Sequence, residues 1–298
     1  MSGKVPDFKA PVVDTGAAAE IASGLWLIPD SHHTPLVPNI GIIVGTRATL
    51  IVDTGLGPDN ARAVLERARD LSGDRPIILT HTHCHPEHGF GANVIAREVT
   101  TVCNEAQWNE LEEKGPVILR MFKDQIPALA PMLAGVEFVR PNLLYTGALK
   151  LDLGGETIVE LFELGGGHSR GDQGILVRGG SNALFTGDLI EESTFAVLSD
   201  NESHVLPWID RLTRLEATAP RIVVPGHGLA SGPELIGAYR GYLDFAKRRV
   251  GELRSTGRDS EALIVDRVTA EILDRYPDWR GQNWVKRTVS DLTWPARA

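Results

Sequence analysis

Cysteine is scarce in this chain, which has only 2 among its 298 residues. Cys84 and Cys103 cannot build a disulfide framework of the kind that holds small secreted domains together. The first residues, 1–7, also lack the apolar core of a secretory signal peptide. We therefore expect a protein of the reducing cytoplasm.

Long apolar runs and an excess of positive charge are absent as well. No apolar stretch approaches the roughly 20 residues that a membrane-spanning helix needs, so we expect a soluble protein with no membrane partner. The net charge is −9, and charges of both signs are interspersed along the chain. These two features argue against nucleic acid as a partner, because a nucleic-acid-binding surface is usually basic.

Histidine, in contrast, is concentrated in one segment. Four of the 9 histidines fall within residues 81–88, directly after an apolar run that we expect to form a strand. The pattern H-x-H-x-E-H occupies six consecutive positions here, and all of its named residues are metal-ligand types. In an extended segment His83 and His85 project to the same side and can bind one ion, while Glu87 and His88 can diverge toward a second. The segment therefore predicts a metal site and suggests two ions.

Three further ligand candidates follow downstream. His168 comes after a strand-like run and three glycines, while Asp188 and His227 each follow an apolar run closely. Each candidate thus stands at the end of an expected strand. A chance clustering of histidines on a polar loop would not produce this arrangement.

The order of these motifs resembles the metallo-β-lactamase superfamily, whose members share H-x-H-x-D-H, then a histidine, a strand-ending aspartate and a last histidine. The match runs from Asp53 to His227. It implies an α/β fold, the αββα sandwich of two mixed β-sheets flanked by helices, here with a C-terminal helical extension. We expect an N-terminal arm over residues 1–20, the main domain over 21–231, and the extension, packed on the same domain, over 232–298.

The resemblance also implies roles for single residues. It assigns site one to His83, His85 and His168, and site two to Glu87, His88 and His227, with Asp188 between the two ions. Glu87 departs from the family pattern, which usually has aspartate at this position. We expect catalysis to depend on Asp188 and Glu87, and Asp53 to lie beneath the cluster and orient a ligating histidine. The two divalent ions would be zinc by family habit, although manganese or iron also accepts such ligands.

The function implied by the resemblance is metal-dependent hydrolysis of a small-molecule substrate. Two ions would hold a shared water as hydroxide for attack on an ester, lactone, amide, thioester or sulfate-type bond. A mononuclear iron dioxygenase with the same ligand frame is one alternative, and a β-lactamase is another that the expected compartment disfavours. Because this fold hosts many reactions, the substrate and its binding residues do not follow from it.

The metal-binding motif could begin at His81 or at His83, because His81 also follows the expected strand directly. A motif beginning at His81 would put His85 where the carboxylate belongs and Pro86 where the last histidine belongs, and proline has no side-chain donor atom. A motif beginning at His83 fills every position. We therefore interpret His81 as a supporting residue behind the ligands, with ligation in place of His83 as the alternative.

Hydrophobic periodicity predicts the remaining elements. We expect strands over 24–29, 39–44, 49–53 and 75–80, a helix from Pro58, a hairpin over 149–162 and amphipathic helices after residue 234. The stretch 105–133 is helical in composition but contains Gly115, Pro116 and Pro127, so we expect broken helices that could serve as a substrate lid.

Several further residues are candidates for the rim of the site or for contacts between subunits. Residues that we expect either in rim segments or in the core are Met121, Phe122, Phe195, Leu198 and Trp208, and the loop histidines His32, His33 and His204 are further rim candidates. Aromatic residues that would complete the fold or form a homodimer contact are Tyr276, Trp279, Trp284 and Trp294. Asp172 and Arg170 are interpreted as turn-forming and locally paired residues.

Overall fold

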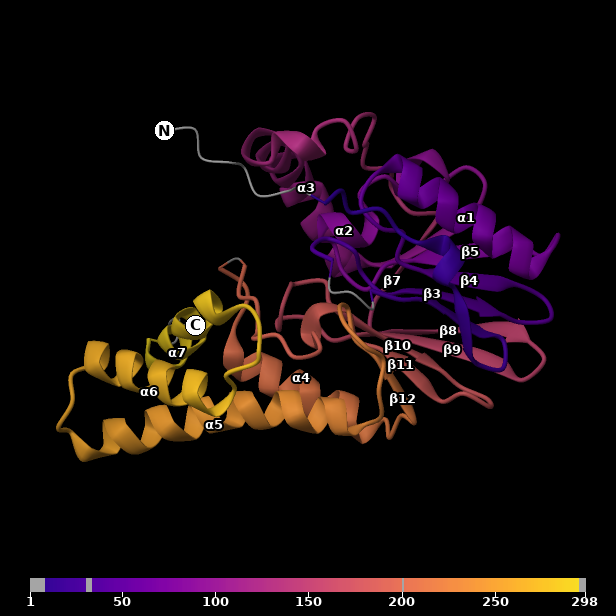
Figure 1. Cartoon of the computed structure of the whole chain (residues 1–298). Coiled ribbons are helices and arrows are strands. Elements are labelled where there is room, and N and C mark those ends of the chain that lie inside the picture. Colours follow the sequence, from indigo (N-terminus) through magenta and orange to yellow (C-terminus); the bar gives the residue numbers. More distant parts are fainter. Residues whose placement is uncertain (1–8, 31–33, 200, 295–298) are drawn as a thin grey trace.

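The computed structural model describes residues 9–30, 34–199 and 201–294 of the chain. Two β-sheets face each other, and helices cover the outer side of each (Figure 1). One sheet has 7 strands in the order β1-β2-β3-β4-β5-β6-β7, and the other has 5 in the order β12-β11-β10-β9-β8. The expected αββα sandwich is therefore confirmed.

The larger sheet comes from the first half of the chain. Its strands are β1 (Ala19–Ala22), β2 (Leu25–Ile28), β3 (Ile40–Val44), β4 (Thr49–Val52), β5 (Ile77–Thr80), β6 (Thr100–Asn104) and β7 (Leu143–Tyr145). The run β2, β3 and β4 is antiparallel, as expected, whereas β5 runs parallel to β4. A parallel pair needs a crossover, and helix α1 (Pro58–Ser72) supplies it. Pro58 suits the first turn of α1, because a backbone N–H there would have no helical partner.

The smaller sheet repeats this plan in the second half. Its strands are β8 (Ala148–Gly154), β9 (Thr157–Glu163), β10 (Gln173–Val177), β11 (Ala183–Phe185) and β12 (Ile222–Val224). The predicted hairpin is the antiparallel pair β8 and β9. Strands β11 and β12 run parallel and are joined through helix α4 (Val205–Ala217), just as β4 and β5 are joined through α1.

The two sheets bury a shared apolar layer between their facing sides. Leu50 and Val52 from β4 belong to the same buried cluster as Leu161 from β9, Ile175 from β10 and Phe185 from β11. Each of these side chains is at most 1% exposed. Such a close-packed layer fixes the strands relative to one another, and hence the loops at their ends.

The N-terminal arm is partly integrated into the fold. Strand β1 begins at Ala19, before the expected arm boundary at residue 20. Further upstream, Val13 is buried against α1, and its backbone N–H donates to Asn60 Oδ1 at 3.0 Å. The described part of the arm therefore packs on the domain.

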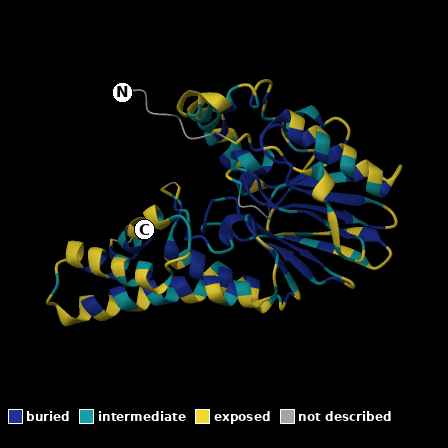
Figure 2. Ribbon diagram, in the orientation of Figure 1, coloured by how far each residue is buried: buried dark blue, intermediate teal, exposed yellow. Residues whose placement is uncertain are grey.

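The C-terminal extension consists of α5 (Glu234–Thr256), α6 (Glu261–Arg275) and α7 (Gln282–Thr293). Helix α5 lies with α4 along the smaller sheet, and α6 and α7 pack against α5 and α4 beyond the end of the sheet (Figure 1). Both buried and exposed residues alternate along these helices (Figure 2), and the buried ones form one apolar cluster. Tyr276 and Trp279 pack into an aromatic cluster with Phe195, Tyr239 and Tyr242. The apolar faces of these helices complete the fold, as expected, and Tyr276 and Trp279 pack against the same core.

The segment expected to form broken helices differs from the prediction. Helix α3 (Glu105–Gln125) continues through Gly115 and Pro116 and ends only before the 3-10 turn η3 (Pro127–Leu129). A proline inside a helix costs about 3 kcal/mol, largely through a lost hydrogen bond and a steric clash. Tertiary packing offsets this cost, since Gly115 is buried so closely against the Phe138 ring that an added Cβ would approach it to 2.9 Å.

Three of the expected rim residues lie in the core instead. Phe195, Leu198 and Trp208 are at most 1% exposed and belong to the apolar cluster of α4 and the C-terminal helices, so the core alternative holds for these three and the rim position does not. His204 does not line the site in the described residues, because its Nδ1 contacts Asp291 Oδ1 of α7 at 2.8 Å.

The candidates His32 and His33 lie outside the described residues. Among the helices of the described ranges, none combines the length and the apolar character that crossing a bilayer requires.

Candidate metal centre

The candidate ligands lie in loops that follow strands. The loop after β5 carries His83 and His85 and then forms the short helix α2 (Pro86–Gly89), which holds Glu87 and His88. The other three come from the smaller sheet: His168 follows β9, Asp188 follows β11 and His227 follows β12. These loops bring His83 and His227, which are far apart in the sequence, to one place.

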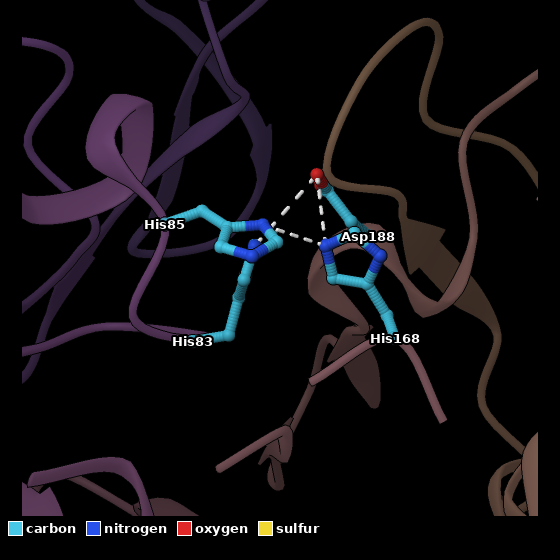
Figure 3. Close-up of side chains that lie close together, drawn as sticks. All are labelled: His83, His85, His168 and Asp188. Atoms are coloured by element: carbon cyan, nitrogen blue, oxygen red, sulfur yellow. Dashed lines mark hydrogen bonds and ion pairs between the residues drawn. The ribbon is translucent and has the colours of Figure 1, made fainter. Parts of the chain in front are cut away.

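The structure gathers these residues into two groups with one shared member. The first group is His83, His85, His168 and Asp188, and the second is Glu87, His88, Asp188 and His227. Within each group the potential ligand atoms all lie within 4.8 Å of one another. Figure 3 shows the first group, in which the three imidazoles and the carboxylate converge. All seven residues predicted from the sequence as ligands are thus brought together.

Asp188 presents one oxygen to each group. Its Oδ2 lies 3.8 Å from Nε2 of both His83 and His168, in the first group. Its Oδ1 lies 3.3 Å from His88 Nε2 and 3.7 Å from His227 Nε2, in the second. This geometry suits a carboxylate that bridges two cations.

Asp53 lies beneath the cluster and holds its neighbours. Its Oδ1 accepts the backbone N–H of Thr82 at 2.7 Å, and its Oδ2 lies 2.9 Å from both Thr82 Oγ1 and His88 Nδ1. Thr82 Oγ1 is also 3.1 Å from His83 Nδ1. Asp53 has a φ of 65°, a strained value for a residue with a side chain, which tends to persist where the surroundings require it. Asp53 and Thr82 together orient both imidazoles so that each Nε2 faces the cluster.

Backbone carbonyls orient two further imidazoles. Nδ1 of His168 lies 3.1 Å from Val197 O, and Nδ1 of His227 lies 2.9 Å from Val37 O. A carbonyl can only accept, so each Nδ1 must carry the proton and donate it. In the neutral form of each imidazole the lone pair is therefore on Nε2, on the side of the cluster, as a metal-ligating histidine requires.

Divalent ions fit the residues present. Nε2 of His83, Nε2 of His88 and Oδ1 of Asp188 are buried and have no hydrogen-bond partner among the described residues. Leaving a buried polar atom unsatisfied costs about 1–3 kcal/mol, so three such atoms in one cluster require a compensating partner. Imidazole nitrogens and carboxylate oxygens in this mixture are suitable donors for zinc, manganese or iron.

Burial and neighbouring charges shift the pKa values of the cluster residues in opposite directions. Burial lowers the pKa of His83 well below its usual value and that of His168 to about 3. Burial would also lower the pKa of His227, but Asp188 and Asp30 outweigh it and raise this pKa to about 9. For Asp188, burial would raise the pKa, but the surrounding histidines hold it well below its usual value. A metal ion entering the second group must therefore displace a proton from His227.

His81 belongs to neither group. Burial lowers its pKa, and its ring packs against Gly89, where an added Cβ would lie 2.8 Å from the His81 ring carbon Cδ2. Its backbone carbonyl accepts a hydrogen bond from Gln107 Nε2 at 3.2 Å. The structure thus places His83 in the cluster and His81 behind it.

The two frames of the motif can be separated by substitution. We expect His83→Ala to reduce the metal content of the purified protein, because it removes a ligand atom, while His81→Ala keeps the wild-type content. Elemental analysis of both variants, each at a verified folded fraction, checks this expectation. Depletion in His81→Ala together with full occupancy in His83→Ala would show that the frame beginning at His83 is wrong.

The loop that carries His168 is fixed by Asp172. Asp172 Oδ2 accepts the backbone N–H groups of His168 at 2.8 Å and Ser169 at 2.9 Å, and Oδ1 accepts Ser169 Oγ at 2.6 Å. Arg170 in the same loop pairs with Glu113 of α3 at 2.6 Å. The interpretation of Asp172 and Arg170 as turn-forming and paired residues is confirmed.

A cavity of about 640 Å³ opens over the cluster. Its floor includes His85, Glu87, His168, Asp188 and His227. One wall is apolar and comes from α3 through Val117, Ile118, Met121 and Phe122. The prediction that Met121 and Phe122 lie at the rim is therefore confirmed, and α3 shapes the space above the cluster.

Sequence reasoning missed three residues of the site. Thr82 could have been found, since a hydroxyl next to the first ligand can orient an imidazole. Glu191 also lines the cavity, and burial followed by the charge of Asp188 raises its pKa to about 8. Its position three residues after Asp188 was the only signal. Arg280 lines the cavity from the C-terminal extension, and no motif marks it.

Comparison with known proteins identifies similar sequences and folds. The sequence model of the metallo-beta-lactamase superfamily matches residues 33–227. Among solved structures, a metallo-beta-lactamase from Pontibacter korlensis is 18% identical with a TM-score of 0.60, and the match covers 76% of this chain and 98% of that one. A stereoselective inverting sec-alkylsulfatase from Pseudomonas sp. is 17% identical with a TM-score of 0.67, covering 92% of this chain and 49% of that one. At these identities the two structures show a common fold.

Proposed function

Because the chain belongs to the metallo-beta-lactamase superfamily, we propose that it is a metal-dependent hydrolase acting on a small molecule in the cavity above the cluster. The observation that carries this proposal is the pair of ligand groups that share Asp188. Each group alone offers four ligand atoms, which is the usual number for a zinc site. The shared carboxylate favours two ions close together over two independent sites.

We propose two divalent ions, zinc in the first instance, with manganese or iron as alternatives. The first group would hold one ion and the second group the other. When bound, such a pair supplies an activated water at neutral pH and polarises the bond to be cleaved.

The chain's own residues prepare this chemistry. Asp53 and Thr82 hold His83 and His88 in the required orientation, and a lost partner of this kind typically lowers metal affinity about 10- to 100-fold. The apolar wall of α3 excludes water from one side of the cavity and offers a surface to an apolar part of the substrate. With an activated water as the nucleophile, hydrolysis would not require a serine or cysteine side chain.

The candidate bonds for cleavage are ester, lactone, amide, thioester and sulfate-type bonds. The fold is shared with a metallo-beta-lactamase and with a sec-alkylsulfatase, and the latter match covers more of this chain. Sulfate esters therefore belong in any substrate panel beside carboxylic esters and β-lactams.

The test begins with the metal content of the purified protein. We expect two equivalents of zinc or manganese, loss of hydrolysis after treatment with a chelator, and recovery after the metal is restored. A panel of chromogenic esters, lactones, β-lactams, phosphodiesters and sulfates would then identify the bond. A single iron per chain, with oxygen consumption and no hydrolysis, would replace this proposal with the dioxygenase alternative.

We also propose that the protein works in the cytoplasm. Cys84 and Cys103 are both free and buried. Burial raises the pKa of each thiol, so neither is a reactive thiolate at neutral pH. Free, inert thiols of this kind are compatible with a reducing compartment.

A further inference from the structure

We propose that Arg280 binds an anionic group of the substrate, so that the substrate is an amphiphile with a negative charge at Arg280 and an apolar part against α3. This inference rests on the proposed hydrolytic function of the same cavity. Arg280 lies between α6 and α7, outside the residues 33–227 that match the family. The C-terminal extension would thus contribute directly to substrate recognition.

The position of Arg280 is fixed on both sides of its backbone. Its N–H donates to Ser193 O at 2.9 Å, and its carbonyl accepts the N–H of Phe195, also at 2.9 Å. The preceding residue, Trp279, packs its ring against Phe195 with 5.3 Å between centroids. The segment is therefore tied to the loop that follows Asp188, and the side chain enters the cavity from there.

The guanidinium is held in place but only partly used. Nη2 donates to Glu192 O at 3.0 Å and to Thr194 Oγ1 at 3.1 Å. A guanidinium has five N–H donors, so those on Nε and Nη1 are left for another acceptor. A preorganised fork of this kind suits a carboxylate, sulfate or phosphate, because the side chain loses little freedom on binding.

Arg280 also differs from the other cation of the cavity. Lys114 is engaged with Glu110 of its own helix at 2.9 Å and with Glu202. No carboxylate within the described ranges forms an ion pair with Arg280. The charge of Arg280 is therefore available to a ligand.

The opposite wall explains the apolar part of the proposed substrate. Val117 and Met121 line the cavity from α3 and are 64% and 40% exposed. Leu36 and Phe122 extend the same lining. The lining of the cavity comes in part from α3 and from Arg280 between α6 and α7, and these elements lie apart from each other in Figure 1. A ligand spanning the cavity would meet a cation at one side and an apolar surface at the other.

A purely structural role for Arg280, as a clamp on residues 192–195, predicts different behaviour. Arg280→Gln removes the charge, and its shorter side chain places the amide nitrogen near the position of Nε, so it also loses the two hydrogen bonds that Nη2 donates. Arg280→Lys keeps the charge. If the residue were only a clamp, loss of these hydrogen bonds would weaken the binding of the uncharged octan-1-ol as much as that of the charged sulfonate.

The experiment measures binding of octane-1-sulfonate to the metal-loaded protein by calorimetry. This probe is an anion with an apolar chain, ligates metals weakly and is not hydrolysed, so its binding is independent of turnover. We expect Arg280→Gln to weaken its binding roughly 10- to 100-fold, as for a lost hydrogen bond to a charged group. Arg280→Lys should retain most of the affinity.

Three controls make the result decisive. Octan-1-ol should bind wild type and Arg280→Gln equally, and Arg258→Gln, at an exposed arginine of the same extension, should bind the sulfonate like the wild type. Melting temperatures confirm that each variant is folded. Equal affinity of wild type and Arg280→Gln for the sulfonate, or no sulfonate binding by the wild type, would overturn the inference, whereas failure of the hydrolase proposal would appear in the metal content instead.

Discussion

Asp188→Asn is expected to abolish turnover while leaving the fold intact. The carboxylate faces both ligand groups, with Oδ2 3.8 Å from His83 Nε2 and Oδ1 3.3 Å from His88 Nε2. An amide keeps the shape but removes the charge and replaces one ligand oxygen by an N–H donor. Because partners outside the ligand sphere are already worth about 10- to 100-fold in metal affinity, loss of a shared ligand should exceed that range.

The measurement pairs steady-state rates with metal analysis on the same preparation, and Gly226→Ala provides a second route to the same carboxylate. A Cβ at Gly226 would lie 1.9 Å from Asp188 Oδ1, 2.8 Å from Gly187 C and 2.9 Å from Asp188 N, so the alanine variant should displace both the carboxylate and the backbone that carries it. We expect reduced activity there too. A folded Asp188→Asn that turns substrate over at the wild-type rate would refute the binuclear hydrolase.

The ligand set was predictable because local sequence carries it. His83, His85, Glu87 and His88 lie within six positions, so the loop after β5 and the short helix α2 present them together. His168 and His227 each follow a strand that periodicity identifies. The sandwich brings these strand ends to one edge, and the resemblance to the family indicated that the ligands would meet there.

The rest depended on tertiary packing that no local pattern records. Apolar residues after Asp188 could face either the cavity or the C-terminal helices, and Phe195 and Trp208 face the helices. Pro116 signals a helix break, yet α3 continues because the packing of Gly115 against Phe138 holds the chain there. Arg280 reaches the cavity only through the packing of the whole extension.

Glu87 is the one ligand position where this chain departs from the family pattern, and the structure shows that its carboxylate reaches the cluster. Glu87 lies with His88, Asp188 and His227, and the ligand atoms of this group are all within 4.8 Å of one another. Compared with aspartate, glutamate has one more rotatable bond that must be ordered when an ion binds. The second group should therefore bind its ion more weakly than the first, which is built from three imidazoles held by short loops.

We expect metal titration of the metal-free protein to proceed in two steps, with the first group filled before the second and with activity appearing only in the second step. Glu87→Ala should leave one tightly held ion and no turnover, because the second group loses its carboxylate ligand while His83, His85 and His168 keep theirs. Glu87→Gln is the matched control, since it keeps the length of the side chain and removes the charge, and it should weaken the second step without affecting the first. Calorimetry with parallel rate measurements distinguishes the outcomes. Two ions of equal affinity in the wild type would contradict the weaker second site, and an unchanged stoichiometry in Glu87→Ala would show that Glu87 is not a ligand.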